Sequence, residues 1–156
     1  MNHLEQELHY PLSDKLPEAG QTIEIAPGVL WIRMGLPFAL NHINLWLIED
    51  VYQTDAGSAH GWTVVDCGIN SDATRDAWEI LFASHLKGLP IVRVIATHCH
   101  PDHVGSADWL CTLWNAPLYM STGEYAFARM MSAGLPGVDG SAMFPHFRKH
   151  GMVTTE

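Results

Sequence analysis

The feature that most constrains the fold is a histidine cluster that comes directly after a short β-branched run. The segment IATHCHPDHVG spans residues 95–105 and contains four closely spaced polar groups, His98, His100, Asp102 and His103. The preceding residues PIVRVIAT predict a short strand, and Pro101 favours the first turn of a helix. The sequence therefore predicts a polar cluster where a strand ends and a helix begins.

Imidazole and carboxylate groups at this spacing are typical of a divalent-metal site. Side chains alternate along an extended segment, so His98, His100 and Asp102 converge, and a helix starting at Pro101 brings His103 beside Asp102. Without thiolate, these are the donors Zn²⁺ or a similar ion takes when it serves as a Lewis acid. The alternative is that these are polar loop histidines at the start of a helix. That interpretation would suit a single histidine, but the joint spacing of all four residues favours a metal site.

The order of predicted elements indicates an α/β fold built in layers. Residues 1–20 form a polar lead-in, and residues 22–35 predict two strands around a turn at Pro27–Gly28. Two more strands follow, INLWLIED and GWTVVDCG, joined by the polar loop DAGSAH. After them helix and strand alternate, in the segments SDATRDAWEILFASHLKG, PIVRVIAT, PDHVGSADWLCTLW, APLYMS and TGEYAFARMMSA. Such a succession favours one mixed sheet with helices on one face.

Length and charge restrict the function classes. The 156 residues fit one domain, and a net charge of −9 with 8 Lys and Arg argues against binding to nucleic acid. No apolar run is long enough for a membrane span, and the N-terminus lacks the pattern of a secretory signal, so we expect no membrane partner and a cytoplasmic location. The 3 cysteines form no C-x-x-C pair, which disfavours a disulfide framework or a thiolate zinc knuckle.

Three segments resemble the metallo-β-lactamase superfamily, including its glyoxalase II-like hydrolases. THCHPDH resembles the superfamily signature T-H-x-H-x-D-H, TVVDCG resembles the strand and Asp-Gly element before it, and NHINLWLIED resembles an early strand. The resemblance covers roughly residues 22 to 120. It implies an αββα sandwich with a one- or two-metal site at the edge between the sheets.

The resemblance also implies a role for each residue of the motif. His98 and His100 would bind a first metal, and Asp102 with His103 a second; Asp66 would orient a ligand from behind. Without the resemblance, Asp66 fits a residue that caps the turn at Gly68. Asp102 is the candidate catalytic group, which orients the metal-bound water or accepts its proton. The implied cofactor is a divalent metal, with Zn expected and Fe or Mn as alternatives.

The chain departs from the superfamily in its C-terminal part. A catalytic zinc normally has three protein ligands, whereas the motif supplies each metal with two. His146 and His150, four residues apart, are a candidate substitute pair, and a helix start with solvated residues explains them equally well. We therefore expect residues 21–156 to form the N-terminal half of the sandwich as one truncated domain.

Three functions remain open on these residues. The first is a metal-dependent hydrolase of a small ester or thioester, impaired by the missing ligands. The second is a metal-binding half-domain without catalysis of its own, and the third an iron-dependent oxidoreductase on the same fold. A half sandwich exposes an apolar sheet face, so the expected partners are a second copy of the chain or the missing half, besides a small-molecule substrate.

Overall fold

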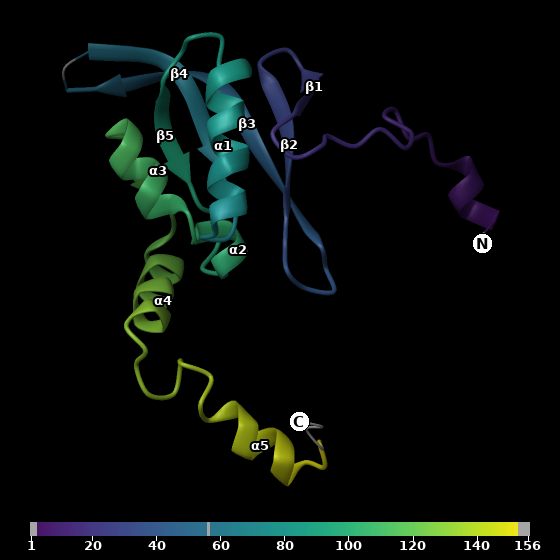
Figure 1. Ribbon diagram of the computed structural model, residues 1–156, viewed down its shortest axis with the longest axis vertical. Coiled ribbons are helices and arrows are strands. Elements are labelled where there is room, and N and C mark those ends of the chain that lie inside the picture. The colour runs from purple at the N-terminus through teal and green to yellow at the C-terminus, as the bar shows by residue number, and fades with distance from the viewer. Residues whose placement is uncertain (1–2, 56, 153–156) are drawn as a thin grey trace.

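The computed structural model describes residues 3–55 and 57–152, and within them the chain forms one six-stranded sheet in the order β1-β2-β3-β4-β5-β6 (Figure 1). Neighbouring strands are antiparallel from β1 to β4, and β4, β5 and β6 run parallel. The strands are β1 Thr22–Ala26, β2 Val29–Gly35, β3 His42–Thr54, β4 Gly57–Val65, β5 Ile91–Ile95 and β6 Leu118–Tyr119.

Helices cover one face of this sheet, as the sequence predicts. The helices of the described residues are η1 His3–Glu7, α1 Asp72–Ser84, α2 Pro101–Val104, α3 Ala107–Trp114, α4 Thr122–Ser132 and α5 Met143–Lys149. In Figure 1, α1 and α3 lie against the sheet, while the lead-in with η1 extends to one side and α4 and α5 extend below it. No helix of the described residues is long and apolar enough to cross a membrane.

The hydrophobic core lies between the sheet and the two covering helices. Alternate strand residues point inward, so Leu45 and Leu47 of β3 and Trp62 of β4 are fully buried together with Trp78 and Leu81 of α1. The indole N–H of Trp62 donates to the Leu86 carbonyl at 2.9 Å, which satisfies its polar atom within the core.

The opposite face of the sheet is open to solvent. It carries Trp31 and Trp46, whose rings stack 6.4 Å apart, and Ile48 and Tyr119, which are 37% and 43% exposed. One mixed sheet with helices on a single face confirms the expected half of a sandwich.

Two local expectations were wrong. The segment at residues 55–60, predicted as a loop, lies largely in β4, since Gly57 to His60 pair with Thr54 to Val51 of β3 and lengthen that hairpin. The helix expected over residues 101–114 is divided into α2 and α3 by Gly105 and Ser106.

Close backbone packing explains why the second helix divides. A Cβ at Gly105 would lie 2.3 Å from the Pro101 carbonyl oxygen and 2.9 Å from the Asn70 nitrogen. Ser106 donates through its N–H to the Gly68 carbonyl and through its hydroxyl to the Ile69 carbonyl. These contacts tie the chain to the loop after β4 and redirect it before α3 begins.

Candidate metal centre

The candidate site forms where two parallel strands end side by side. Val65 of β4 is paired with Ile95 of β5, so the residues that follow each strand emerge at the same edge of the sheet. The Asp66 N–H donates to the Ile95 carbonyl and the Cys67 N–H to the His103 carbonyl, each at 2.8 Å. The loop after β4 is thereby fastened to the histidine cluster after β5.

Asp66 is buried and occupies the left-handed region at φ 61°, a conformation that aspartate adopts more readily than most residues. Its carboxylate accepts from the Thr97 N–H at 2.8 Å and from the Thr97 hydroxyl at 2.9 Å. Its Oδ2 also lies 2.8 Å from Nδ1 of His103. Asp66 therefore contacts the motif directly from behind, rather than only capping the turn at Gly68.

The hydrogen-bond partners fix which imidazole nitrogens carry protons. An ionised carboxylate only accepts, so Nδ1 of His103 donates to Asp66 and the Thr97 hydroxyl donates to it as well. The Thr97 oxygen then accepts from Nδ1 of His98, 2.9 Å away. In their neutral forms His98 and His103 thus both present an unprotonated Nε2, which is the form that binds a metal.

The four motif donors lie together as two pairs. Nε2 of His98 lies 3.1 Å from Nδ1 of His100, and Nε2 of His103 lies 3.5 Å from Oδ2 of Asp102. The ring centroids of His98 and His103 are 3.8 Å apart, so the pairs adjoin each other. The side chains of Asp102 and His103 are about one-fifth exposed, at 22% and 21%, which leaves them accessible to a small ligand.

The separation of the two donors within each pair is compatible with their binding one divalent metal ion. Two donors bound to one tetrahedral Zn²⁺ at about 2.0–2.1 Å are about 3.3 Å apart, and the observed 3.1 and 3.5 Å bracket that value. Across the described part of the chain, however, no three His, Cys, Asp or Glu side chains are grouped so as to hold one ion. Each pair of the motif therefore consists of two donors, with no third grouped beside it among the described residues.

Glu124 of α4 also reaches this loop, a contact the sequence reasoning missed. Its Oε2 accepts from the backbone N–H of Cys99 at 2.8 Å, between the two histidines of the first pair. The pKa of Glu124 is lowered, first by a hydrogen bond from the Cys99 thiol, then by the one from its N–H, and further by His98 and His100. The available signal was its position one turn into the helix that follows β6, the strand beside β5.

The cysteines near the site are poor thiolate donors. Burial raises the pKa of the Cys67 thiol far above its usual range. Partial desolvation and the neighbouring Glu124 carboxylate raise the pKa of Cys99. These shifts disfavour the thiolate forms of Cys67 and Cys99.

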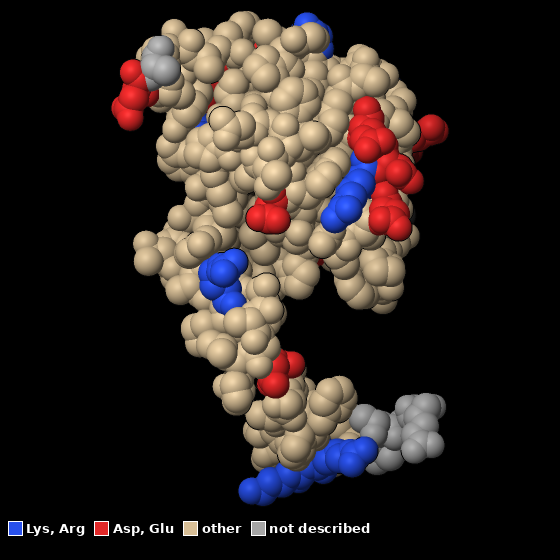
Figure 2. Space-filling view, turned by 60° about the vertical axis from the view of Figure 1, so that its left-hand side comes forward, with Lys and Arg blue, Asp and Glu red and all other residues tan. Residues whose placement is uncertain are grey.

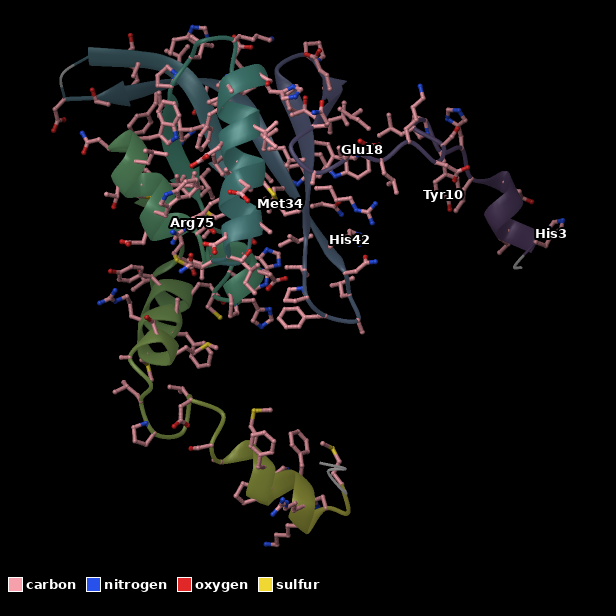
Figure 3. The ribbon with its side chains drawn as sticks, in the orientation of Figure 1. His3, Tyr10, Glu18, Met34, His42 and Arg75 are labelled. Atoms are coloured by element: carbon pink, nitrogen blue, oxygen red, sulfur yellow. The ribbon has the colours of Figure 1, made fainter. Side chains whose placement is uncertain are left out.

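The candidate substitute ligands lie apart from the motif. His146 and His150 are neighbours on the C-terminal helix, with ring centroids 4.6 Å apart. Figure 1 shows α5 well separated from α2, which carries Asp102 and His103. His42, labelled in Figure 3, lies at the start of β3 with its Nδ1 2.8 Å from Oδ1 of Asn41.

Charge is sparse on the face of the molecule shown in Figure 2. Acidic side chains gather near one edge of the upper part, and the basic side chains at the foot lie on α5, whose last turn contains Arg148 and Lys149. This face presents no broad basic surface of the kind that holds a phosphate backbone.

A mixed sheet whose strand ends present paired histidine and carboxylate donors defines a class of α/β proteins with a candidate metal centre. The family model described as "Metallo-beta-lactamase superfamily" matches residues 41–143, and the chain belongs to that superfamily. A search of curated proteins found no match.

Solved structures agree with this assignment. A beta-lactamase domain protein from Burkholderia ambifaria is 52% identical, with a TM-score of 0.82 over 97% of this chain and 43% of its own. A metallo-beta-lactamase family protein from Thermus thermophilus is 24% identical, with a TM-score of 0.65 over 85% of this chain and 41% of its own. This second likeness concerns the fold alone. The chain spans less than half the length of both proteins.

Proposed function

We propose that this chain is the metal-binding portion of a metal-dependent hydrolase that acts on a small ester or thioester. The observation that carries the proposal is the set of hydrogen-bond contacts around Asp66 and Thr97, from which Nε2 of neutral His98 and of neutral His103 follows as the unprotonated nitrogen. Superfamily membership, typical of metal-dependent hydrolases, supports the same reaction class.

Each motif residue has a role in this proposal. His98 and His100 would hold one metal, and Asp102 with His103 a second, with Zn²⁺ as the favoured ion. A bound metal would supply a water of lowered pKa and would polarise the substrate carbonyl. The Asp102 carboxylate would orient this water or accept its proton, because it is the partly exposed carboxylate of the motif. Asp66 is buried, and its carboxylate already accepts from Thr97 and His103.

Metal content per chain is the direct test of this proposal. The wild type, incubated with Zn²⁺ and desalted, is compared with a His98→Ala, His100→Ala double variant. A His146→Ala, His150→Ala variant is the matched control, since it also removes two neighbouring histidines but from the C-terminal helix. We expect the metal content per chain to fall below that of the wild type in the first variant, which loses one of the two proposed donor pairs, and to be unchanged in the second. A metal content equal to that of the wild type after loss of His98 and His100 would contradict the proposed donors.

A second candidate function is a metal-binding half-domain without its own catalysis. It is favoured because, in the region the structure describes, no third donor joins either pair. Turnover of a generic thioester or chromogenic ester separates the two functions, since bound metal with zero rate supports the half-domain. The identity of the retained metal tests the remaining alternative, an iron-dependent oxidoreductase. A requirement for iron in the activity would favour that alternative.

We also propose that the open sheet face binds a second copy of this chain or a segment equivalent to the rest of its relatives' domain. Support comes from exposed apolar side chains on that face, such as Ile48 and Tyr119. A cytoplasmic location stays a prediction from the sequence.

A further inference from the structure

We propose that Glu124 is a positioning residue for the loop of residues 97–100: its carboxylate holds the backbone of Cys99 and thereby keeps Nε2 of His98 close to Nδ1 of His100. The inference rests on the proposed function for what the histidines bind, and on geometry alone for how they are held.

The sheet topology brings Glu124 to the loop. β6 lies beside β5 and runs parallel to it, and the Ala96 N–H donates to the Tyr119 carbonyl at 2.9 Å. The residues that follow these two strands therefore emerge at the same edge. Since α4 begins at Thr122, its first turn brings Glu124 to the backbone of Cys99.

The local structure of α4 directs the carboxylate outward. Ser121 caps the helix, and its hydroxyl accepts from the Glu124 N–H at 3.3 Å. This is the serine half of a capping box, in which a glutamate at this position commonly reaches back to the N–H of the capping residue. Here Oε2 of Glu124 accepts the Cys99 N–H at 2.8 Å instead, a contact between residues 25 positions apart.

Cys99 lies between two backbone segments that are each held by hydrogen bonds. On one side of it Thr97 is fixed by Asp66, and on the other the His100 carbonyl accepts from the N–H groups of His103 and Val104 in α2. The bond from Glu124 holds the residue between these two anchored points. A third fixed point restrains the backbone on both sides of Cys99, and with it the 3.1 Å separation of the His98 and His100 nitrogens.

Amide hydrogen exchange of Cys99, measured by NMR on the metal-free full chain, tests the bond itself. For Glu124→Ala we expect exchange about tenfold faster than wild type, together with loss of the nuclear Overhauser contact between the rings of His98 and His100. Glu124→Gln keeps an accepting oxygen at the same reach, so protection returns close to wild type. Glu79→Ala, which removes an exposed glutamate of α1, is the matched control and leaves the Cys99 amide unchanged.

Two further measurements keep the positioning role separate from folding and from the proposed function. Glu124→Asp retains the charge but is one methylene too short, and we expect it to behave like Glu124→Ala. Co²⁺ affinity, followed by absorption, is expected to fall about tenfold in both and to recover in Glu124→Gln. Wild-type exchange at Cys99 in the alanine and aspartate variants would overturn the inference. A wild type that takes up no Co²⁺ would overturn the proposed function instead, while the exchange data still decide the role of Glu124.

Discussion

Asp66 illustrates how one buried side chain determines the chemistry of three others. Its carboxylate accepts from the Thr97 N–H and hydroxyl and from the His103 ring, and the Thr97 oxygen in turn accepts from His98. Because an ionised carboxylate has no proton to give, every proton in this chain of hydrogen bonds points toward it. The donor atoms of the candidate site are thus prepared by a residue that does not belong to the histidine motif.

Asp66→Asn should disturb both stability and metal binding. Asparagine has one accepting oxygen and one NH₂ group where aspartate has two accepting oxygens. Its NH₂ group would therefore lie against N–H or O–H groups that also need an acceptor. We expect a loss of about 1–3 kcal/mol in the free energy of unfolding and about 10–100-fold weaker Zn²⁺ affinity. Urea denaturation of metal-free protein and competition with a chelator measure the two effects. Asp76→Asn, an exposed position on α1, is the control, and equal behaviour of the two variants would contradict the prediction.

At the scale of secondary-structure elements, the break between α2 and α3 depends on the absence of a side chain at Gly105. Gly105→Ala places a Cβ against the Pro101 carbonyl and the Asn70 nitrogen, both backbone atoms that cannot rotate away. We expect destabilisation of about 1–3 kcal/mol, measured by chemical denaturation. Gly123→Ala is the control, because its Cβ meets open space in the first turn of α4 and should be neutral or slightly stabilising. Equal stability of the two variants would show that the close approach at Gly105 is unimportant.

Three strands are joined on the open face by a polar network around Asp50. Its carboxylate accepts from the Thr63 hydroxyl at 2.7 Å and from the Arg93 guanidinium, which also lies over the rings of Tyr52 and Tyr119. These contacts, the Thr63 hydrogen bond first, lower the pKa of Asp50 below its ordinary value.

The lowered pKa of Asp50 predicts a specific pH dependence of stability. A carboxylate whose folded pKa is depressed contributes its full stabilisation above the unfolded pKa of about 3.9 and loses it as the pH falls through the folded value. The wild type should therefore be more stable than Asp50→Asn by a constant amount between about pH 5 and pH 7, on the order of 1 kcal/mol for a partly exposed pair. Below about pH 4 the difference should shrink. Denaturation curves across this range test it, and a difference that grows on acidification would contradict it.

The sequence identified the elements whose signals are local. The segment predicted as a helix from residue 71 onward forms α1 with Ser71 as its cap, and the predicted turn at Pro27–Gly28 joins β1 and β2. It failed where the determining partner is distant along the chain, as with Gly105, which packs against the loop after β4. The same limit applies to the site: the spacing predicted that the histidines and Asp102 lie together, which they do, but Glu124 was missed because its contact with Cys99 depends on β6 lying beside β5.

At the scale of the whole molecule, the two faces of the sheet differ in what covers them. The face under α1 and α3 buries a continuous set of apolar residues, whereas the other leaves Trp31, Trp46 and Ile48 partly exposed. Large apolar patches seldom remain free on soluble monomers, and a stable dimer generally removes such a patch from water. We therefore expect two copies of the chain to associate through the open face.

Sedimentation equilibrium at micromolar concentration tests this dependence. We expect the wild type to form dimers and Ile48→Asp to shift the equilibrium toward monomer, because a charge placed within the interface would be desolvated on association. Leu113→Asp, at a residue of α3 that is 54% exposed on the helix-covered side, is the matched control and should dimerise like the wild type. A monomeric wild type would rule out the second copy as occupant. The remaining occupant would then be a segment equivalent to the rest of the relatives' domain, and adding that segment in trans should protect the Trp31 and Trp46 rings from solvent quenching of their fluorescence.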